Sequence, residues 1–367
     1  MLVWLTLLAC NGKATDTAAV EPLVLPADPS ASGAPVGVQT HTHQGVTFEV
    51  WYPTTDAQAG SATEPADFGQ FLPASFTERV GAITLPSPDS GAIRDAPIRD
   101  TGAALPVVLF SHGFGGFRLQ SFDITVHLAS RGYIVVAPDH PGRMMTDLLP
   151  CLFSPPLDGC DLTGFVDDPA LEGLPAALDW IAGSDLAGYA DAEQLGLIGH
   201  SAGGGSVSTL AGTEPRTAAV IPMAGGGAIT ADVPALFIDG ECDGIVSPGS
   251  TAAAAAGSAD ATHARLLGAG HLAFSDMCAL DLGALADEHL DGRDDLNSTF
   301  YSQLLSLGID GCSGAVPAES TGCTGDFLGI EAGLTLTRAL ATEFFDLHLR
   351  GEGEGVTTTD AALELTP

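Results

Sequence analysis

The sequence predicts an α/β fold with a mostly parallel central sheet, flanking helices and loop insertions. Three observations support this. Short apolar runs of strand length alternate with helical segments between residues 106 and 267, as in β-α-β units. The run QLGLIGHSAGGGSVSTLA places a serine between an expected strand and an expected helix. The chain has 367 residues, 45% of them hydrophobic, enough for one large core; beyond the N-terminus it has no apolar stretch of membrane-spanning length.

The N-terminal segment resembles an export signal. MLVWLTLLAC is apolar and ends in Leu-Leu-Ala-Cys, similar to a bacterial lipoprotein signal, in which the cysteine becomes the lipidated first residue. We therefore expect residues 1–10 to be a signal peptide and Cys10 to be a lipidation site. The mature protein is expected to be a bacterial cell-envelope lipoprotein or secreted. Residues 11–35, which are polar and rich in Thr, Ala and Pro, predict a flexible tether.

The folded domain is expected to span residues 36–350 and to begin with an antiparallel pair of strands. Residues 53–103 are rich in Pro, Ala, Gly, Ser and Asp and have one helical patch, so we interpret them as an insertion. The elements expected up to the serine are strands at 36–40, 46–52, 106–110, 133–137 and 195–198, helices at 118–130 and 169–181, and a second insertion at 141–165.

The same alternation continues after the serine. The expected elements are a helix at 206–210, strands at 218–223 and 234–238, a helix around 252–256 and a last strand at 264–267. A third insertion, charged and glycine-rich, covers residues 279–330. A closing helix is predicted near 330–349 because its apolar residues recur at helical spacing. Residues 351–367 are expected to be a C-terminal tail.

The chain is strongly acidic, with 46 acidic and 12 basic residues and a net charge of −34. Such a surface repels phosphate backbones and anionic membrane faces. We therefore expect no nucleic-acid partner, and no membrane contact except through a lipid on Cys10. The acidic stretch at residues 287–297 lacks the ligand spacing of an EF-hand and is expected to be a solvated loop.

Six cysteines remain after Cys10, and in an exported protein they predict three disulfides. Proximity in the sequence favours two pairs and leaves a third. The expected pairs are Cys151–Cys160, Cys312–Cys323 and Cys242–Cys278. No Cys/His spacing typical of a zinc site is present, and we expect neither a metal nor a cofactor.

The serine lies in Gly199-His200-Ser201-Ala202-Gly203, which fits the G-x-S-x-G pattern of a nucleophile elbow. In such an elbow a strand turns sharply into a helix and holds the serine in a strained backbone conformation. Side chains at Gly199 and Gly203 would collide in that turn. The pattern therefore predicts Ser201 as a nucleophile at the N-terminus of a helix.

A serine nucleophile needs a base, and the base needs an acid that fixes its tautomer. Among the histidines after Ser201, His271 is favoured because glycines surround it directly after an apolar strand. The acid is expected in the segment after residue 238. Asp243 is favoured because it lies a short turn beyond the strand, and Asp239 and Glu241 remain alternatives.

The negative oxygen of the tetrahedral intermediate needs two backbone N–H donors. Ala202, which follows the nucleophile, is one candidate, and Phe114 in the His-Gly-Phe-Gly-Gly loop at residues 112–116 is the other. The ring of Phe114 is also expected to contribute to the acyl pocket, and His112 to brace the loop.

The runs VLFSHGFGGFR at residues 108–118 and HLASRGYIVVA at residues 127–137 resemble the platelet-activating factor acetylhydrolase branch of the α/β-hydrolases. They are also similar to dienelactone-hydrolase-like esterases and to cutinase-type polyesterases. The resemblance implies a metal-independent serine esterase with Ser201, Asp243 and His271 as its triad. It also implies a disulfide between the acid loop and the histidine loop, for which Cys242 and Cys278 are placed.

The function expected from these residues is hydrolysis of carboxylic esters, with short acyl chains, through an acyl-enzyme intermediate. The expected partner is a small-molecule, lipid or polymer ester. The alternatives are a lipase, a polyester hydrolase or a peptidase on the same triad. A non-catalytic surface-anchored protein that keeps the fold is a further alternative.

Overall fold

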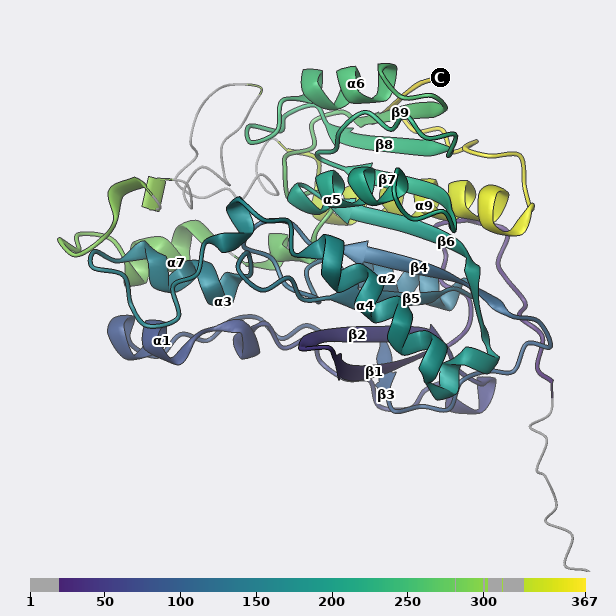
Figure 1. Cartoon of the computed structure of the whole chain (residues 1–367), viewed down its shortest axis with the longest axis horizontal. Coiled ribbons are helices and arrows are strands. Elements are labelled where there is room, and N and C mark those ends of the chain that lie inside the picture. Colours follow the sequence, from purple (N-terminus) through teal and green to yellow (C-terminus); the bar gives the residue numbers. More distant parts are fainter. Residues whose placement is uncertain (1–19, 281, 300, 303–311, 313–326) are drawn as a thin grey trace, which may run out of the picture.

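The computed structural model describes residues 20–280, 282–299, 301, 302, 312 and 327–367. A ten-stranded sheet runs through the molecule in the order β10-β9-β8-β7-β6-β4-β5-β2-β1-β3 (Figure 1). Its strands are β1 (Val36–His43), β2 (Val46–Pro53), β3 (Ala92–Arg94), β4 (Leu105–Ser111), β5 (Ile134–Pro138), β6 (Ala190–His200), β7 (Thr217–Met223), β8 (Ala235–Gly240), β9 (Ala261–Leu266) and β10 (Leu363–Thr366).

The central strands β5, β4, β6, β7, β8 and β9 are parallel. β2 pairs antiparallel with both β1 and β5, which confirms the predicted antiparallel pair of strands at the start of the domain.

The helices are α1 (Ala74–Val80), α2 (Phe122–Ser130), α3 (Met145–Leu148), α4 (Ala170–Gly183), α5 (Ala202–Ala211), α6 (Pro248–Ala256), α7 (Leu282–His289) and α9 (Ile330–Arg350).

Each face of the sheet is covered by its own apolar core. Successive residues of a strand point to opposite faces, and in β4 this sends Val108 and Phe110 into the core with α2 and α9. Val107 and Leu109 enter the core with α4, α5 and α6. These strands are buried on both faces, which explains their near-continuous apolar sequences. The predicted α/β architecture is confirmed.

Two elements of the sheet lie outside the predicted set. β3 falls inside the insertion at 53–103 and pairs with β1. β10 falls inside the expected C-terminal tail and pairs antiparallel with β9, so that Leu363 lies opposite Leu266. The expectation that 264–267 holds the last strand was therefore wrong. A four-residue edge strand has little periodicity of its own, and its pairing depends on β9.

Residues 20–35, part of the expected tether, have no helix or strand but lie against α2. The guanidinium of Arg131 donates to the carbonyl of Pro26 at 2.9 Å, and Gly33 N–H donates to Ser130 Oγ at 3.0 Å. The expected signal peptide and Cys10 lie outside the described residues. Among the described helices, none is long and apolar enough to cross a membrane.

Two disulfides join described cysteines. Cys151–Cys160 is as predicted. Cys242 bonds to Cys312, 70 residues away, so the predicted pairs Cys242–Cys278 and Cys312–Cys323 were wrong. Cys278 is disulfide-bonded as well. Proximity in the sequence failed here because Cys312 lies against the loop after β8, far from it in the chain.

Candidate active site

Ser201 lies at the junction of β6 and α5 with a positive φ of 57°, a conformation that is strained for a residue with a side chain. Two glycines make the turn possible. A Cβ on Gly203 would lie 2.0 Å from the carbonyl oxygen of Ser111, and one on Gly199 would lie 2.4 Å from that of Gly203. Ser201 N–H donates to Met223 O at 2.8 Å. The sequence therefore builds a crowded elbow.

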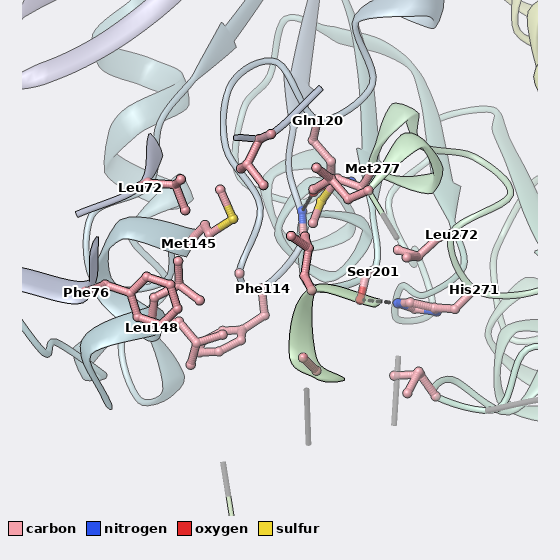
Figure 2. A pocket seen from close by; sticks show the side chains of 18 of the residues that line it. Leu72, Phe76, Phe114, Gln120, Met145, Leu148, Ser201, His271, Leu272 and Met277 are labelled. Atoms are coloured by element: carbon pink, nitrogen blue, oxygen red, sulfur yellow. Dashed lines mark hydrogen bonds between the residues drawn. The ribbon is translucent and has the colours of Figure 1, made fainter. Parts of the chain in front are cut away.

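The loops after β8 and β9 bring an acid and a base to this serine. His271 Nε2 lies 3.0 Å from Ser201 Oγ (Figure 2). Its Nδ1 lies 2.8 Å from Asp243 Oδ2. A carboxylate only accepts hydrogen bonds, so Nδ1 carries the proton and Nε2 is left to accept from the serine hydroxyl. His271 and Asp243 are each only 4% exposed. The three residues can thus move a proton from Ser201 to His271.

The acid loop is held by backbone contacts. The N–H groups of Ile245 and Val246 both donate to Asp243 Oδ1 at 2.8 Å, and Cys242 N–H donates to Ala269 O at 2.9 Å. The Cys242–Cys312 disulfide anchors the residue before Asp243. These contacts fix the carboxylate toward His271. The alternative acids lie elsewhere: Asp239 pairs with Arg265 and His263, and Glu241 accepts from Gly268 N–H.

The loop at residues 112–116 packs against the elbow. A Cβ on Gly113 would lie 3.2 Å from Ser201 Cβ, and Phe114 lines the cavity at the serine. His112 is fully buried; its Nδ1 donates to Gly113 O and its Nε2 accepts from His140 N–H. Burial is the main reason that the pKa of His112 falls to about 3. It is therefore a neutral hydrogen-bonding residue, as a bracing role requires.

Gln120 and His200 form a connection that sequence reasoning missed. Gln120 Oε1 accepts from Gly113 N–H at 2.8 Å, and Gln120 Nε2 donates to His200 Nδ1 at 2.8 Å. His200 Nε2 then donates to the carbonyl of His271 at 2.8 Å. One chain of hydrogen bonds thus joins the loop of Phe114, the elbow and the histidine loop.

His200 can fill this position because it stays uncharged. Burial, and secondly the neighbouring His271, lower its pKa to about 3. Its position before the nucleophile was visible in the sequence. Its partner Gln120 was not, because it precedes α2 in a segment where we expected a helix, and no spacing links it to residue 200.

A cavity of about 470 Å³ begins at Ser201, and most of its described lining is apolar. Among the described residues, the one group of potential metal ligands is Glu241, Cys242 and Cys312. Both of its cysteine sulfurs are consumed by a disulfide, so this group is not a metal site.

Two family models match adjoining parts of the chain. Residues 37–146 match "Platelet-activating factor acetylhydrolase, isoform II", and residues 161–274 match "PET hydrolase-like". The platelet-activating factor acetylhydrolase of Cavia porcellus is 30% identical over 112 residues, which are 27% of this chain and 24% of that protein. That of Canis lupus familiaris is 42% identical over 60 residues, which are 16% of this chain and 12% of that protein. The matched segments thus span about a quarter or less of these relatives.

A solved structure, the ferulic acid esterase from Streptomyces cinnamoneus, superposes with a TM-score of 0.59 at 20% identity. The superposition covers 91% of this chain and 96% of that one, which establishes a shared fold. The sheet order, the elbow and both family matches agree with it. The chain therefore has the fold of an α/β-hydrolase esterase, and separate parts of it are similar to platelet-activating factor acetylhydrolases and to PET hydrolase-like proteins.

Proposed function

We propose that this protein is a serine hydrolase that cleaves carboxylic esters through a covalent acyl-enzyme. The observation that carries the proposal is the hydrogen-bonded series Ser201–His271–Asp243 at the edge of an apolar cavity. A serine hydroxyl is a weak nucleophile unless a base removes its proton. The hydrogen bonds of His271 to Ser201 and to Asp243 support the roles of base and orienting carboxylate for these two residues.

In the first half of the reaction Ser201 Oγ attacks the ester carbonyl and His271 Nε2 takes the hydroxyl proton. Asp243 stabilises the resulting imidazolium. The bond from the carbonyl carbon to the alcohol oxygen then breaks, and His271 returns its proton to that oxygen. In the second half a water gives a proton to His271, its oxygen attacks the acyl carbon, and the Ser201–acyl bond breaks as Oγ regains the proton.

The oxyanion of each tetrahedral intermediate would accept from the N–H groups of Ala202 and Phe114. Ala202 is the first residue of α5, so its N–H has no acceptor within the helix and lies at the helix's positive end. Losing one such donor typically slows an enzyme of this class by about 10²–10³. A short ester is the minimal substrate of this arrangement, because only its carbonyl must reach Ser201 and the two amides.

The test is to compare Ser201→Ala with the parent chain on p-nitrophenyl acetate and in fluorophosphonate labelling. We expect both signals to vanish in the variant. Ser250→Ala, on the exposed side of α6, is the matched control and should keep both. Labelling that persists in Ser201→Ala would refute the nucleophile. A poly(ethylene terephthalate) film and a peptide panel on the parent chain separate the polyesterase and peptidase alternatives.

We further propose that the protein is exported. The Cys151–Cys160 and Cys242–Cys312 disulfides support this, because disulfides persist mainly in oxidising compartments. Lipidation of Cys10 is the finer part of the proposal. Metabolic labelling with a fatty-acid analogue should mark the parent chain and not Cys10→Ala; equal labelling of both would rule out that site.

A further inference from the structure

The three insertions supply much of the apolar wall of the cavity at Ser201, and the rest of the lining comes from the end of β6 and from loops that follow the strands. Leu72 and Phe76 come from the first insertion, Met145 and Leu148 from the second, and Leu285 from the third. Figure 1 shows α1, α3 and α7 gathered beyond one end of the sheet. Segments that the sequence marked as separate loops therefore contribute side chains to one cavity.

The insertions also hold one another. Ser75 Oγ donates to Asp158 O at 2.7 Å, and the rings of Phe76 and Phe153 meet edge to face with centroids 6.0 Å apart. These contacts join the first insertion to the second. They fix α1 next to the segment that follows α3.

The third insertion is attached to both of the others. Arg79 Nε donates to Asp295 Oδ2 at 2.8 Å. Asn297 N–H donates to Leu152 O at 2.7 Å, and Ser154 N–H donates to Asp295 O at 2.8 Å. The cavity therefore has a built wall whose parts support each other, as expected of a preformed binding pocket.

The described lining of the cavity has no permanently charged side chain. Its polar side chains belong to Gln120, His200, Ser201, His271 and His289, and none of its described lining residues is Arg, Lys, Asp or Glu. This is notable in a chain with a net charge of −34. An ionised group placed among these side chains would lose its hydration and would find no permanently charged partner, so its binding there is unfavourable.

The position of the apolar wall indicates which part of an ester it would hold. In Figure 2, Leu72, Phe76, Met145 and Leu148 lie on the side of Ser201 away from His271. His271 must protonate the leaving alcohol oxygen, so the alcohol part lies on the side of His271. The acyl part therefore extends toward the wall.

Building on the proposed function, we propose that this cavity is an acyl pocket and that the favoured substrates are neutral esters of medium-length aliphatic acids. Acetate reaches the triad but leaves the wall unfilled. An octanoyl chain buries its methylenes against α1, α3 and α7. Acids with a second, ionised carboxylate are excluded.

The test is a series of p-nitrophenyl esters from acetate to octanoate on the full chain. We expect kcat/KM to rise by up to about fourfold for each methylene that becomes buried. The mono-p-nitrophenyl ester of adipic acid, with its free carboxylate, should react at least about tenfold more slowly than the hexanoate. Falling kcat/KM along the series would overturn the acyl pocket while leaving the proposed function intact. If the full chain hydrolyses none of the esters in the series, the proposed function itself is refuted.

Substitutions in the cavity wall test whether the insertions cause the preference for longer acyl chains. Leu285→Trp on α7 and Ile83→Trp in the first insertion both place a larger side chain in the cavity at partly exposed positions. Each should lower the octanoate-to-acetate ratio of kcat/KM by about tenfold through overpacking. Asp287→Trp, exposed on α7 and outside the lining, is the matched control and should keep the parent ratio. An unchanged ratio in both cavity variants would refute the assignment.

Discussion

Two aspartate–histidine pairs lie on the same two neighbouring strands and their loops, and only one of them faces a serine. Asp239 in β8 contacts His263 Nε2 at 2.9 Å and also accepts from Arg265. Asp243, in the loop after β8, accepts from His271 Nδ1 at 2.8 Å. The two carboxylates are both buried, so burial does not distinguish them.

The two carboxylates differ in whether a permanent cation is bonded to them. Asp239 lies directly opposite Arg265 in the β8–β9 register, so a permanent cation already neutralises it. The other oxygen of Asp243 accepts from the backbone of Ile245 and Val246, and these donors carry no full charge. An imidazolium formed on His271 is therefore the cation that Asp243 is placed to stabilise. The first pair ties two strands together, and the second is the one for which we propose proton transfer.

The largest expected effect comes from exchanging each acid for its amide. Asp243→Asn should lower kcat for p-nitrophenyl acetate by about 10⁴, because the amide no longer fixes the tautomer of His271. Asp239→Asn should change kcat by no more than a few-fold. Steady-state kinetics of both folded variants measure this. Similar losses in the two would remove the distinction between the pairs.

A smaller effect is expected at Gln120, because Gln120 bonds His200 and His200 holds the backbone of His271. Gln120→Glu keeps the acceptor for Gly113 N–H, but an ionised carboxylate cannot donate to His200 Nδ1. We expect kcat to fall by about 10- to 100-fold at pH 8, with KM nearly unchanged.

The pH dependence of this variant separates positioning from simple damage. A buried carboxylate beside His200 favours the protonated imidazole, so it should raise the histidine pKa from its present value of about 3. As the pH falls, His200 gains a proton with which to bond the carboxylate, and the ratio of parent to variant kcat should narrow. A ratio that stays constant with pH would indicate that Gln120 only stabilises the fold.

Asp239→Asn should act on stability instead. Burial alone would raise the pKa of Asp239, but hydrogen bonds from Arg265 and His263 outweigh it and lower the pKa. The unfolded chain then binds this proton more readily than the folded one, so the parent gains stability above pH ~4 and loses it in more acidic solution. Urea unfolding should show a deficit of about 1–3 kcal/mol in the variant at pH 7 that shrinks in acid. A deficit independent of pH would contradict the ion pair.

The smallest effect is expected for His263→Gln. The amide can still donate to Asp239, and Arg265 remains, so the free energy of unfolding should change by less than about 1 kcal/mol. The kcat should match that of the parent. His271→Gln, which removes the proposed base, is the comparison and should lose activity. Activity near the parent level in His271→Gln would contradict the assignment of the base.

Much of the fold was readable from local pattern. The parallel strands are buried on both faces and so have continuous apolar sequences. Gly199 is required by a contact with Gly203 inside the elbow itself, whereas Gly203 is required by the carbonyl of Ser111 on the neighbouring strand β4. What local pattern missed depends on contacts between distant segments. β10 needs β9 as a template, and the Cys242–Cys312 bond joins cysteines that are 70 residues apart in the sequence.

The sequence by itself determined the strand–turn–helix context of Ser201 and the chain order of serine, acid and histidine, because those depend on neighbouring residues and on the succession of strands. Only the tertiary structure decided which carboxylate meets which histidine, that Gln120 and His200 join the loops, and that three insertions wall one cavity. These outcomes depend on sheet register and on how loops pack between residues 28 to 216 positions apart in the chain, which local propensity does not encode.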